Sequence, residues 1–220
     1  MAKFRDIEKF HNFLLCHKKP KDYLGDRGFS LDTLAEFQVG YVPPFEHHWM
    51  SGRIIVPIFD SYGRFLDISG RKLPPIDNKN DVKWINGKFN YTSIGETSKK
   101  HHLYNLNKAK NYILDKKFAV ITEGYFDVFA AWQAGAKNIV ATCGTNFSYT
   151  HLCLLLRYCD FFIFAFDADS AGEKARDDAI SMIEGVVAYD FLNMPSGMDV
   201  DDFIKRYGKD KFLEMIEDKL

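Results

Sequence analysis

The chain has 220 residues, 46% hydrophobic and 15% aromatic, which is enough to bury a core in one large domain or two small ones. Its apolar runs are too short to cross a bilayer and its first residues are charged, so we expect neither a membrane span nor a signal peptide. The four cysteines form no Cys-x-x-Cys pair, which argues against a zinc ribbon or a disulfide framework and favours a reducing, cytoplasmic setting.

The charge is unevenly distributed along the chain. The net charge is −1, but residues 1–117 carry 20 Lys and Arg against 13 Asp and Glu, whereas residues 118–220 carry 9 against 17. A basic half beside an acidic half is typical of a polyanion-binding surface next to a carboxylate metal site. Two domains with ordinary surface bias would give the same numbers.

The first half of the chain begins with helical patterns. Residues 3–16 place apolar side chains on one helical face, and Lys18-Lys19-Pro20 is expected to end that helix. A second helix is predicted at 30–37, with Ser30 as its N-cap, and Gly40 stops it. A third is predicted at 103–110.

A hairpin follows the first two helices. Residues 53–60 and 63–71 are apolar and strand-like, and a short polar turn separates them. Pro57 favours an edge position or a bulge, because proline cannot donate a ladder hydrogen bond. Residues 74–100 are polar and predict only short strands.

From residue 118 the pattern becomes a strand–helix alternation. Fully apolar strands that alternate with helices predict a buried parallel sheet with right-handed crossovers. Cys153 and Cys159 are expected to be core thiols. We expect strands at 118–122, 138–142, 161–166 and 186–192, helices at 125–134, 149–158 and 171–183, and two closing helices at 200–207 and 210–218.

Acidic residues stand where the predicted strands end. Glu123 follows the first strand, and Asp167 and Asp169 follow the third, two positions apart and so on the same side of an extended backbone. Carboxylates so close together repel one another unless a cation lies between them, and oxygen ligands favour Mg²⁺ or Mn²⁺. Asp127 lies one turn past Glu123.

A second Asp-x-Asp pair, Asp199 and Asp201, follows the last strand. One such pair alone is explained as well by a turn with capping acids. The combination of acids after two parallel strands, with the Gly144-Thr145 turn between them, is more specific and predicts metal-dependent chemistry on phosphates.

These residues carry a family resemblance. The segments 123–128, 141–145 and 166–172 resemble the motifs of the TOPRIM fold, which bacterial-type primases, topoisomerases and some nucleases share. The upstream segments 23–30, 37–43, 53–58 and 69–71 resemble the basic subdomain of DnaG-type primases, and 198–203 is similar to that family's Asp-Pro-Asp segment.

The resemblance implies a fold and a division of the chain. The fold class is α/β: an α+β N-terminal subdomain followed by a TOPRIM, Rossmann-like parallel sheet flanked by helices. The expected parts are a basic primase-core subdomain at 1–116, a TOPRIM domain at 117–195, and an acidic segment with helices at 196–220.

The resemblance also implies an activity and its residues. It implies a DNA primase, an RNA polymerase that makes short primers on single-stranded DNA from NTPs with two or more Mg²⁺ or Mn²⁺ ions. Catalysis and metal binding fall on Glu123, Asp167 and Asp169, with Asp127, Asp199 and Asp201 supporting. Nucleic-acid or nucleotide binding falls on Arg27, Arg53, Arg71, Lys88, Lys99 and Lys100.

Two features separate this chain from most bacterial primases. Neither the N-terminal zinc ribbon nor the C-terminal helicase-binding domain is recognised in its sequence, so we expect an isolated core, a fragment, or a compact bacteriophage or mobile-element primase. We therefore expect a separate helicase and a separate zinc-binding module as partners, in the cytoplasm of a bacterial or phage-infected cell. The alternatives are a TOPRIM nuclease and a non-catalytic single-strand-binding module.

Overall fold

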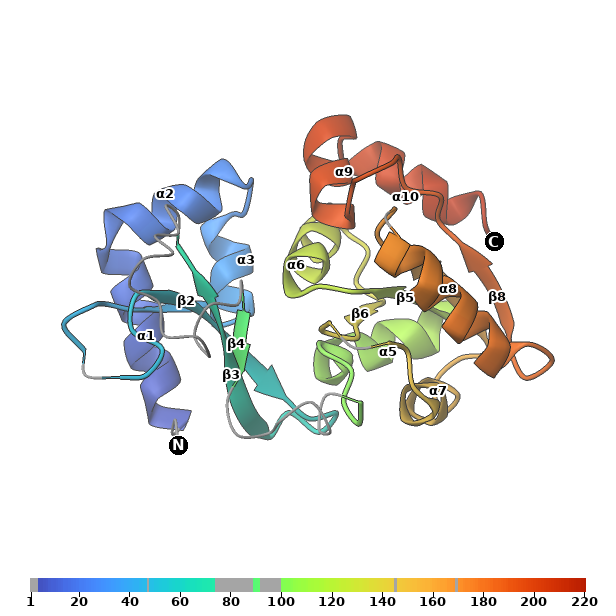
Figure 1. Ribbon diagram of the computed structural model, residues 1–220, viewed down its shortest axis with the longest axis horizontal. Coiled ribbons are helices and arrows are strands. Elements are labelled where there is room, and N and C mark those ends of the chain that lie inside the picture. Colours follow the sequence, from blue (N-terminus) through green and yellow to red (C-terminus); the bar gives the residue numbers. More distant parts are fainter. Residues whose placement is uncertain (1–3, 47, 74–88, 92–99, 145, 169) are drawn as a thin grey trace. The chain divides into compact units, whose positions relative to one another are not determined.

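The protein forms two compact units. The computed structural model describes residues 4–46, 48–73, 89–91, 100–144, 146–168 and 170–220 (Figure 1). The first unit takes in 1–58 and 65–95, and the second takes in 59–64 and 96–220. The expected boundary at 116 thus lies inside the second unit, and the three-part division of the chain stays a proposal.

The first unit combines helices with an antiparallel ladder. Its sheet has the order β1-β2-β3-β4, and the pairs β1–β2 and β3–β4 are antiparallel. Apolar side chains from helix and sheet, among them Phe10, Val42 and Ile68, form its core. The elements are α1 (Phe4–Cys16), α2 (Lys18–Asp26), α3 (Leu31–Glu36), β1 (Gly40–Val42), β2 (Arg53–Phe59), β3 (Phe65–Lys72) and β4 (Phe89–Tyr91).

The sequence prediction missed two elements of this unit, α2 and β1. A helix begins at Lys18, where Lys18-Lys19-Pro20 was expected to end helical structure. Pro20 lies in the first turn of α2, where no backbone N–H is needed for an intrahelical hydrogen bond. The predicted N-cap is confirmed, because the Ser30 hydroxyl accepts a hydrogen bond from the Thr33 N–H at 3.1 Å.

Of the two places expected for Pro57, an edge strand or a bulge, the edge strand is wrong, since β2 has neighbours on both sides. The ladder to β1 uses only residues 53–55 of β2. Pro57 therefore lies beyond the end of that ladder, where its missing N–H costs no hydrogen bond to β1.

The second unit is built on a four-stranded parallel sheet. The strand order is β6-β5-β7-β8, with β5 and β7 in the centre. This confirms the predicted parallel sheet with flanking helices. Its elements are α5 (Leu106–Lys116), β5 (Phe118–Thr122), α6 (Tyr125–Ala134), β6 (Ile139–Ala141), α7 (Tyr149–Leu155), β7 (Phe161–Ala165), α8 (Ser170–Ile183), β8 (Ala188–Phe191), α9 (Val200–Tyr207) and α10 (Lys209–Glu217).

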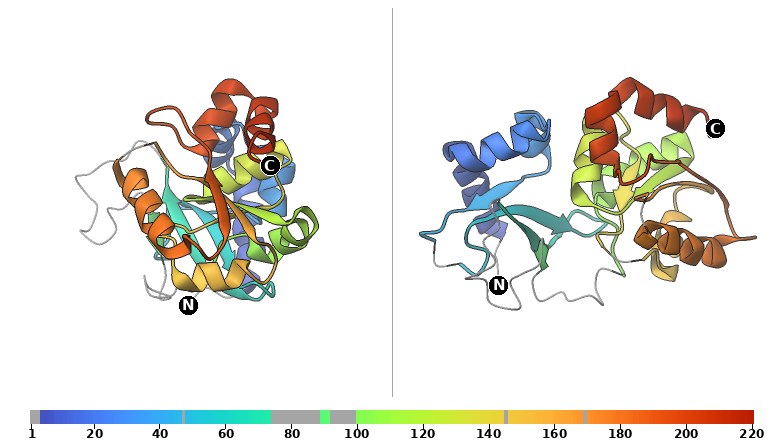
Figure 2. Two further views of the ribbon diagram at one scale, coloured as in Figure 1. Left: turned by 90° about the vertical axis from the view of Figure 1, so that its right-hand side faces the viewer. Right: turned by 45° about the horizontal axis from the view of Figure 1, so that its top comes forward.

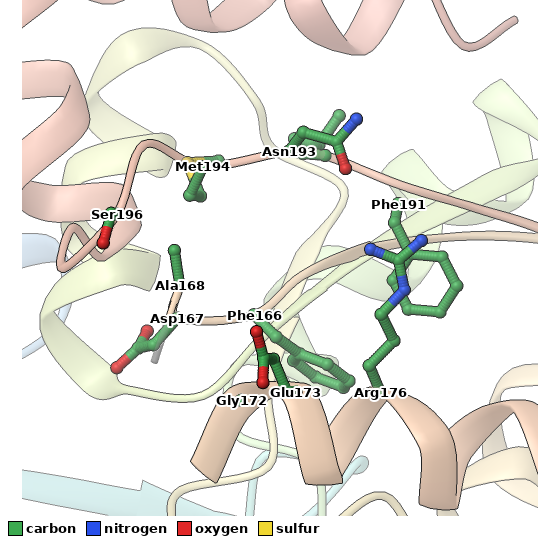
Figure 3. Close-up of a pocket in the computed structure, with 11 residues that line it drawn as sticks. Phe166, Asp167, Ala168, Gly172, Glu173, Arg176, Phe191, Asn193, Met194 and Ser196 are labelled. Atoms are coloured by element: carbon green, nitrogen blue, oxygen red, sulfur yellow. The ribbon is translucent and has the colours of Figure 1, made fainter. Parts of the chain in front are cut away.

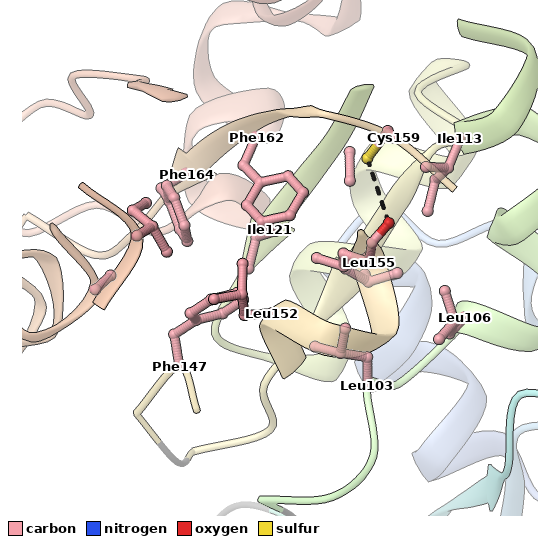
Figure 4. Close-up of a cluster of buried hydrophobic side chains, with 14 of the residues drawn as sticks. Leu103, Leu106, Ile113, Ile121, Phe147, Leu152, Leu155, Cys159, Phe162 and Phe164 are labelled. Carbon is pink, nitrogen blue, oxygen red and sulfur yellow. Dashed lines mark hydrogen bonds between the residues drawn. The ribbon is translucent and has the colours of Figure 1, made fainter. Parts of the chain in front are cut away.

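The main core of this unit lies between the sheet and three helices. Ala119 and Ile121 of β5 point into a cluster with apolar side chains of α5, α7 and α8 (Figure 4). Helices α9 and α10 instead contact α6 and lie side by side (Figure 2). Since neighbouring residues of a strand point to opposite faces, both faces of β5 are buried, as its continuous apolar sequence predicts.

The two cysteines of this region differ in their surroundings. Cys159 is buried and its thiol lies 3.9 Å from the Leu155 carbonyl oxygen. Burial raises the pKa of the Cys159 thiol to about 12, so it stays protonated and unreactive. Cys153 is exposed, so the prediction of a core thiol there was wrong: it lies on the outer side of α7.

None of the described helices has both the length and the apolar run that crossing a bilayer requires.

The contact of α1 with β1 gives a stability test. A Cβ added at Gly40 would lie 2.7 Å from Phe10 Cβ and 2.8 Å from the Phe10 carbonyl carbon, so Gly40→Ala should force α1 away from the sheet. We expect a loss of about 1–3 kcal/mol in the free energy of unfolding, measured by urea denaturation of the whole chain.

The matched control for this test is Gly25→Ala in α2, where an added Cβ meets no atom within 4 Å. This change should be neutral or stabilise the protein by about 0.5–1 kcal/mol. Equal effects of the two substitutions would contradict the close packing of α1 on β1.

Candidate metal centre

The register of β5 and β7 brings two of the predicted acids together. Thr122 of β5 pairs with Ala165 of β7, so both strands end at the same edge of the sheet. Glu123 directly follows β5, and Asp167 follows β7 after a single residue. The Glu123 Oε1 accepts a hydrogen bond from the Asp167 N–H at 3.1 Å, which fixes the carboxylate of one loop against the backbone of the other.

Asp127 links this edge to the C-terminal helices. It lies in the first turn of α6 and is only 4% exposed. Its Oδ2 accepts a hydrogen bond from the Gly124 N–H at 2.9 Å, and its Oδ1 accepts one from the Asp201 N–H at 3.1 Å. Each carboxylate oxygen of Asp127 thus holds a backbone N–H, one beside α6 and one in α9.

The loop before α9 is tied to the loop after β7. The Ala168 N–H donates to the Met198 carbonyl at 3.5 Å, and the Gly197 N–H donates to the Ala168 carbonyl at 3.1 Å. Asp199 then caps α9, since its Oδ1 accepts from the Asp202 N–H at 2.7 Å. These bonds tie the segment that leads to Asp199 and Asp201 to the loop that carries Asp167.

The charges of the neighbouring acids act on Asp127. Burial raises the pKa of the Asp127 carboxyl well above its usual range. The negative charges of Asp199, Asp167 and Asp201 raise this pKa further. Several carboxylates that disfavour one another's ionisation form a region of negative potential that a cation would relieve.

The residues present fit a hard divalent cation. The available donors are carboxylate oxygens, which suit Mg²⁺ or Mn²⁺ and not a thiolate-bound zinc. Within the described part of the chain, no three His, Cys, Asp or Glu side chains already converge as a ligand set. Asp169, predicted as the third ligand, lies outside the described residues, so its place in the site stays a prediction.

Two glycines shape the loops around the acids. A Cβ on Gly172 would collide with the Asp167 carbonyl oxygen, so only glycine lets the start of α8 approach that loop. Gly144 has a φ of 76° and donates its N–H to the Glu123 carbonyl at 3.3 Å. The Gly144 turn that the sequence singled out therefore supports the loop of Glu123, and Thr145 lies outside the described residues.

The predicted arginines belong to the first unit and are largely enclosed. Arg53 is 2% exposed, and its Nη1 donates to the Gly70 carbonyl at 3.4 Å. A Cβ on Gly70 would lie 3.0 Å from Arg53 Cδ, so this glycine leaves room for the arginine. Arg71 is 9% exposed and donates from Nε to the Tyr23 hydroxyl at 2.8 Å.

Tyr23 was not predicted from the sequence as a functional residue. Its hydroxyl fixes Arg71 across 48 positions, a pairing that no local pattern signals.

The structure describes two of the four remaining predicted basic residues, Arg27 and Lys100. Arg27 is half-buried at the C-cap of α2, where its N–H donates to the Tyr23 carbonyl at 3.3 Å. Lys100 is exposed, and its carbonyl accepts a hydrogen bond from the Ser148 hydroxyl at 2.6 Å. Lys88 and Lys99 lie outside the described residues. Ligand binding by all these residues stays a prediction.

Comparisons with known proteins agree with this architecture. Residues 120–204 match the family described as Toprim-like. A DNA primase of Lactococcus lactis is 30% identical over 233 residues, which cover 91% of this chain and 36% of that protein.

Several solved structures that resemble the chain are domains of DNA primases. The zinc-binding and RNA polymerase domains of the Aquifex aeolicus primase match with a TM-score of 0.84 and 25% identity, over 97% of this chain and 59% of that one. The chain is built as a DnaG-type primase core. A DnaG primase catalytic domain bound to single-stranded DNA also matches this primase core, with a TM-score of 0.77 and 25% identity, over 96% of this chain and 78% of that one.

The primase core spans only part of its relatives: about a third of the Lactococcus lactis protein's length, and 47% of an Aquifex aeolicus DNA primase that is 27% identical. These relatives are bacterial, so the expected bacteriophage origin stays a prediction. Neither a nuclease nor a non-catalytic binding module gains support from these matches.

The acid cluster of this primase core predicts stabilisation by metal. A cation that binds only the folded state stabilises it by about 2.7 kcal/mol at 100 times its dissociation constant. For a chain of this size we expect Mg²⁺ or Mn²⁺ to raise the thermal unfolding midpoint by about 5–10 °C. Asp167→Asn should remove most of this shift, as measured by calorimetry with and without metal.

The control for the metal shift is Asp160→Asn. Asp160 is an exposed acid just before β7, at the opposite end of the strand from Asp167, so the change in charge is the same. This variant should keep the full shift. A metal shift that survives Asp167→Asn unchanged would contradict the metal centre.

Proposed function

We propose that this primase core is a divalent-metal-dependent DNA primase that synthesises short RNA primers on single-stranded DNA. The observation that carries the proposal is the cluster of Glu123, Asp167, Asp127 and the Asp199–Asp201 segment at the carboxyl edge of a primase-like parallel sheet. In open α/β sheets, this edge is where ligands bind.

The proposed reaction joins two ribonucleotides. The 3′ oxygen of one attacks the α-phosphorus of the next, the bond from that phosphorus to the bridging oxygen breaks, and pyrophosphate leaves. When bound, Mg²⁺ or Mn²⁺ ions neutralise charge on the triphosphate and on the leaving pyrophosphate. Glu123, Asp167 and Asp169 would hold these ions, and two or more ions are expected.

The protein's own groups divide the remaining work. Glu123 is the proposed base for the 3′-hydroxyl proton, and the Asp167 N–H holds its carboxylate in position for that task. Because both oxygens of Asp127 accept backbone hydrogen bonds, its main proposed use is to position α6 against α9. Direct metal binding by Asp127, Asp199 and Asp201 remains a further part of the proposal.

The template and the partners are also part of the proposal. Single-stranded DNA is the template and NTPs are the substrates, with Arg27, Arg53, Arg71, Lys88, Lys99 and Lys100 as binding residues. Arg53 would have to become more accessible to touch either. A separate replicative helicase and a separate zinc-binding module are the proposed partners, in the cytoplasm of a bacterial or phage-infected cell.

A primer-synthesis assay tests the function. The whole chain is incubated with single-stranded DNA, four NTPs and Mg²⁺ or Mn²⁺, and labelled oligoribonucleotides are separated on a gel. We expect short products that require both template and metal. Asp167→Asn should lower the rate by about 100-fold or more, because it removes charge that stabilises the transition state.

The Asp160→Asn variant serves again as the matched control and should retain the rate. A circular dichroism spectrum confirms that both variants are folded. The proposal fails if no oligoribonucleotide forms even when helicase and zinc-module proteins are supplied, or if Asp167→Asn works as well as the unchanged chain.

A further inference from the structure

A cavity of about 300 Å³ opens beside Asp167, on the side of the sheet edge that faces α8 and β8 (Figure 3). Its walls come from the loop after β7, the first two turns of α8, and the segment after β8. This volume is at the lower end of the range for small-molecule sites. The polar side chains on the cavity wall opposite Asp167 take no part in the hydrogen bonds that hold the acid cluster together.

Arg176 forms one wall of the cavity as part of a stacked pair. Its guanidinium carbon lies 4.0 Å from the ring centroid of Phe191, which is itself 5% exposed. Such stacking holds the planar guanidinium flat against the ring while its N–H groups remain available at the edge. In the described part of the chain, Arg176 has no ion-pair partner, so no carboxylate of that part occupies its donors.

Two further polar side chains complete the lining. Figure 3 shows the Glu173 carboxylate and the Asn193 amide on different sides of the opening, with the Arg176 guanidinium at the Phe191 ring. Glu173 provides only acceptors, Arg176 only donors, and Asn193 provides both. The apolar surface between them includes Phe166 and Leu192.

The charges select the chemical class of ligand. A phosphate in this cavity would meet the carboxylates of Asp167 and Glu173 and gain only Arg176. A neutral, flat ligand with donors on one edge and acceptors on another meets no such repulsion. Nucleobases have this character, and the neighbouring acid cluster is the proposed place for a nucleotide's metal-bound phosphates.

Among the bases, guanine matches the lining best. Its N1–H and 2-amino group are donors suited to the Glu173 carboxylate, and its O6 and N7 are acceptors that Arg176 can contact in a bidentate manner. Adenine would place its N1 acceptor against the carboxylate and offer only N7 to the guanidinium. We propose that this cavity binds the guanine base of a ribonucleotide, with Glu173 and Arg176 as the residues that determine specificity.

This inference rests on the proposed function and narrows it. During elongation, each added nucleotide must pair with the template, so its base changes from one position to the next. A pocket that binds only one kind of base therefore suits a nucleotide whose base is always the same. The first nucleotide of the primer meets that condition, because its choice can be built into the protein. Primers should therefore begin with G.

Equilibrium binding tests the pocket without any synthesis. The whole chain in Mg²⁺ is titrated by calorimetry with GTP, ITP and ATP. The base of ITP lacks only the 2-amino group of guanine. A lost hydrogen bond to a charged acceptor lowers affinity by about 10-fold or more, so GTP should bind at least that much more tightly than ITP, and ATP should bind more weakly still.

Two variants separate the roles of the two residues. Glu173→Gln should bring the ratio of GTP to ITP affinity close to one. Arg176→Ala should weaken GTP and ITP by a similar factor, because both bases carry O6 and N7. Equal binding of GTP, ITP and ATP by the unchanged chain, or an unchanged GTP-to-ITP ratio in Glu173→Gln, would overturn the proposal.

Matched controls come from the same unit. Glu184→Gln changes an exposed acid just past the C-terminal end of α8. Arg157→Ala removes another arginine that stacks on an aromatic ring, 5.7 Å from the Tyr158 centroid, and Arg157 does not line the cavity. Both should leave the three affinities unchanged. A loss of base preference in either control would likewise overturn the proposal.

A second measurement separates failure of the pocket from failure of the proposed function. The 5′ nucleotide of primers made on templates of varied sequence is determined for the unchanged chain and for Glu173→Gln. Synthesis with no preference for G would contradict the pocket and leave primer synthesis intact. A clear GTP preference in binding without any synthesis would contradict the function and leave the pocket intact.

Discussion

The parallel pairing of β5 with β7 is the constraint on which the rest of the second unit depends. Because Thr122 and Ala165 are in register, the loops that carry Glu123 and Asp167 leave the sheet together and meet through one hydrogen bond. A slip of one residue would exchange the two buried faces of one strand, each packed against different helices, and would move Glu123 away from the Asp167 N–H. The pairing of β5 with β7 thus determines both the packing of the core and the positions of the acids.

The acid cluster sets a second requirement, because it opposes folding in the absence of a cation. The backbone supplies part of the compensation: N–H groups of Gly124, Asp201, Asp202 and Asp167 each meet a carboxylate oxygen. These dipoles offset part of the repulsion among the acids and help the protein hold several of them close together. A site built this way keeps its negative potential for a metal, which lysines or arginines in the same places would cancel.

Local patterns predicted the fold of the second unit well and its contacts poorly. The strand at 118–122 and the helices at 125–134 and 200–207 have the predicted bounds, since apolar runs and helical faces are short-range signals. The bond from Asp201 to Asp127 spans 74 positions and has no such signal. In the first unit, α2 was missed because Pro20 was interpreted as a stop, although proline is compatible with a first turn.

The hydrogen bonds between the loop of Ala168 and the segment 197–198 have a consequence for anyone who trims the protein. A truncation after residue 195 would keep every strand of the parallel sheet. It would also take away the partner of Asp127 Oδ1 and the two bonds that tether the loop after β7. Such a truncation would also uncover the part of α6 that α9 and α10 contact, so the C-terminal helices belong to the core of the unit as well as to the acid cluster.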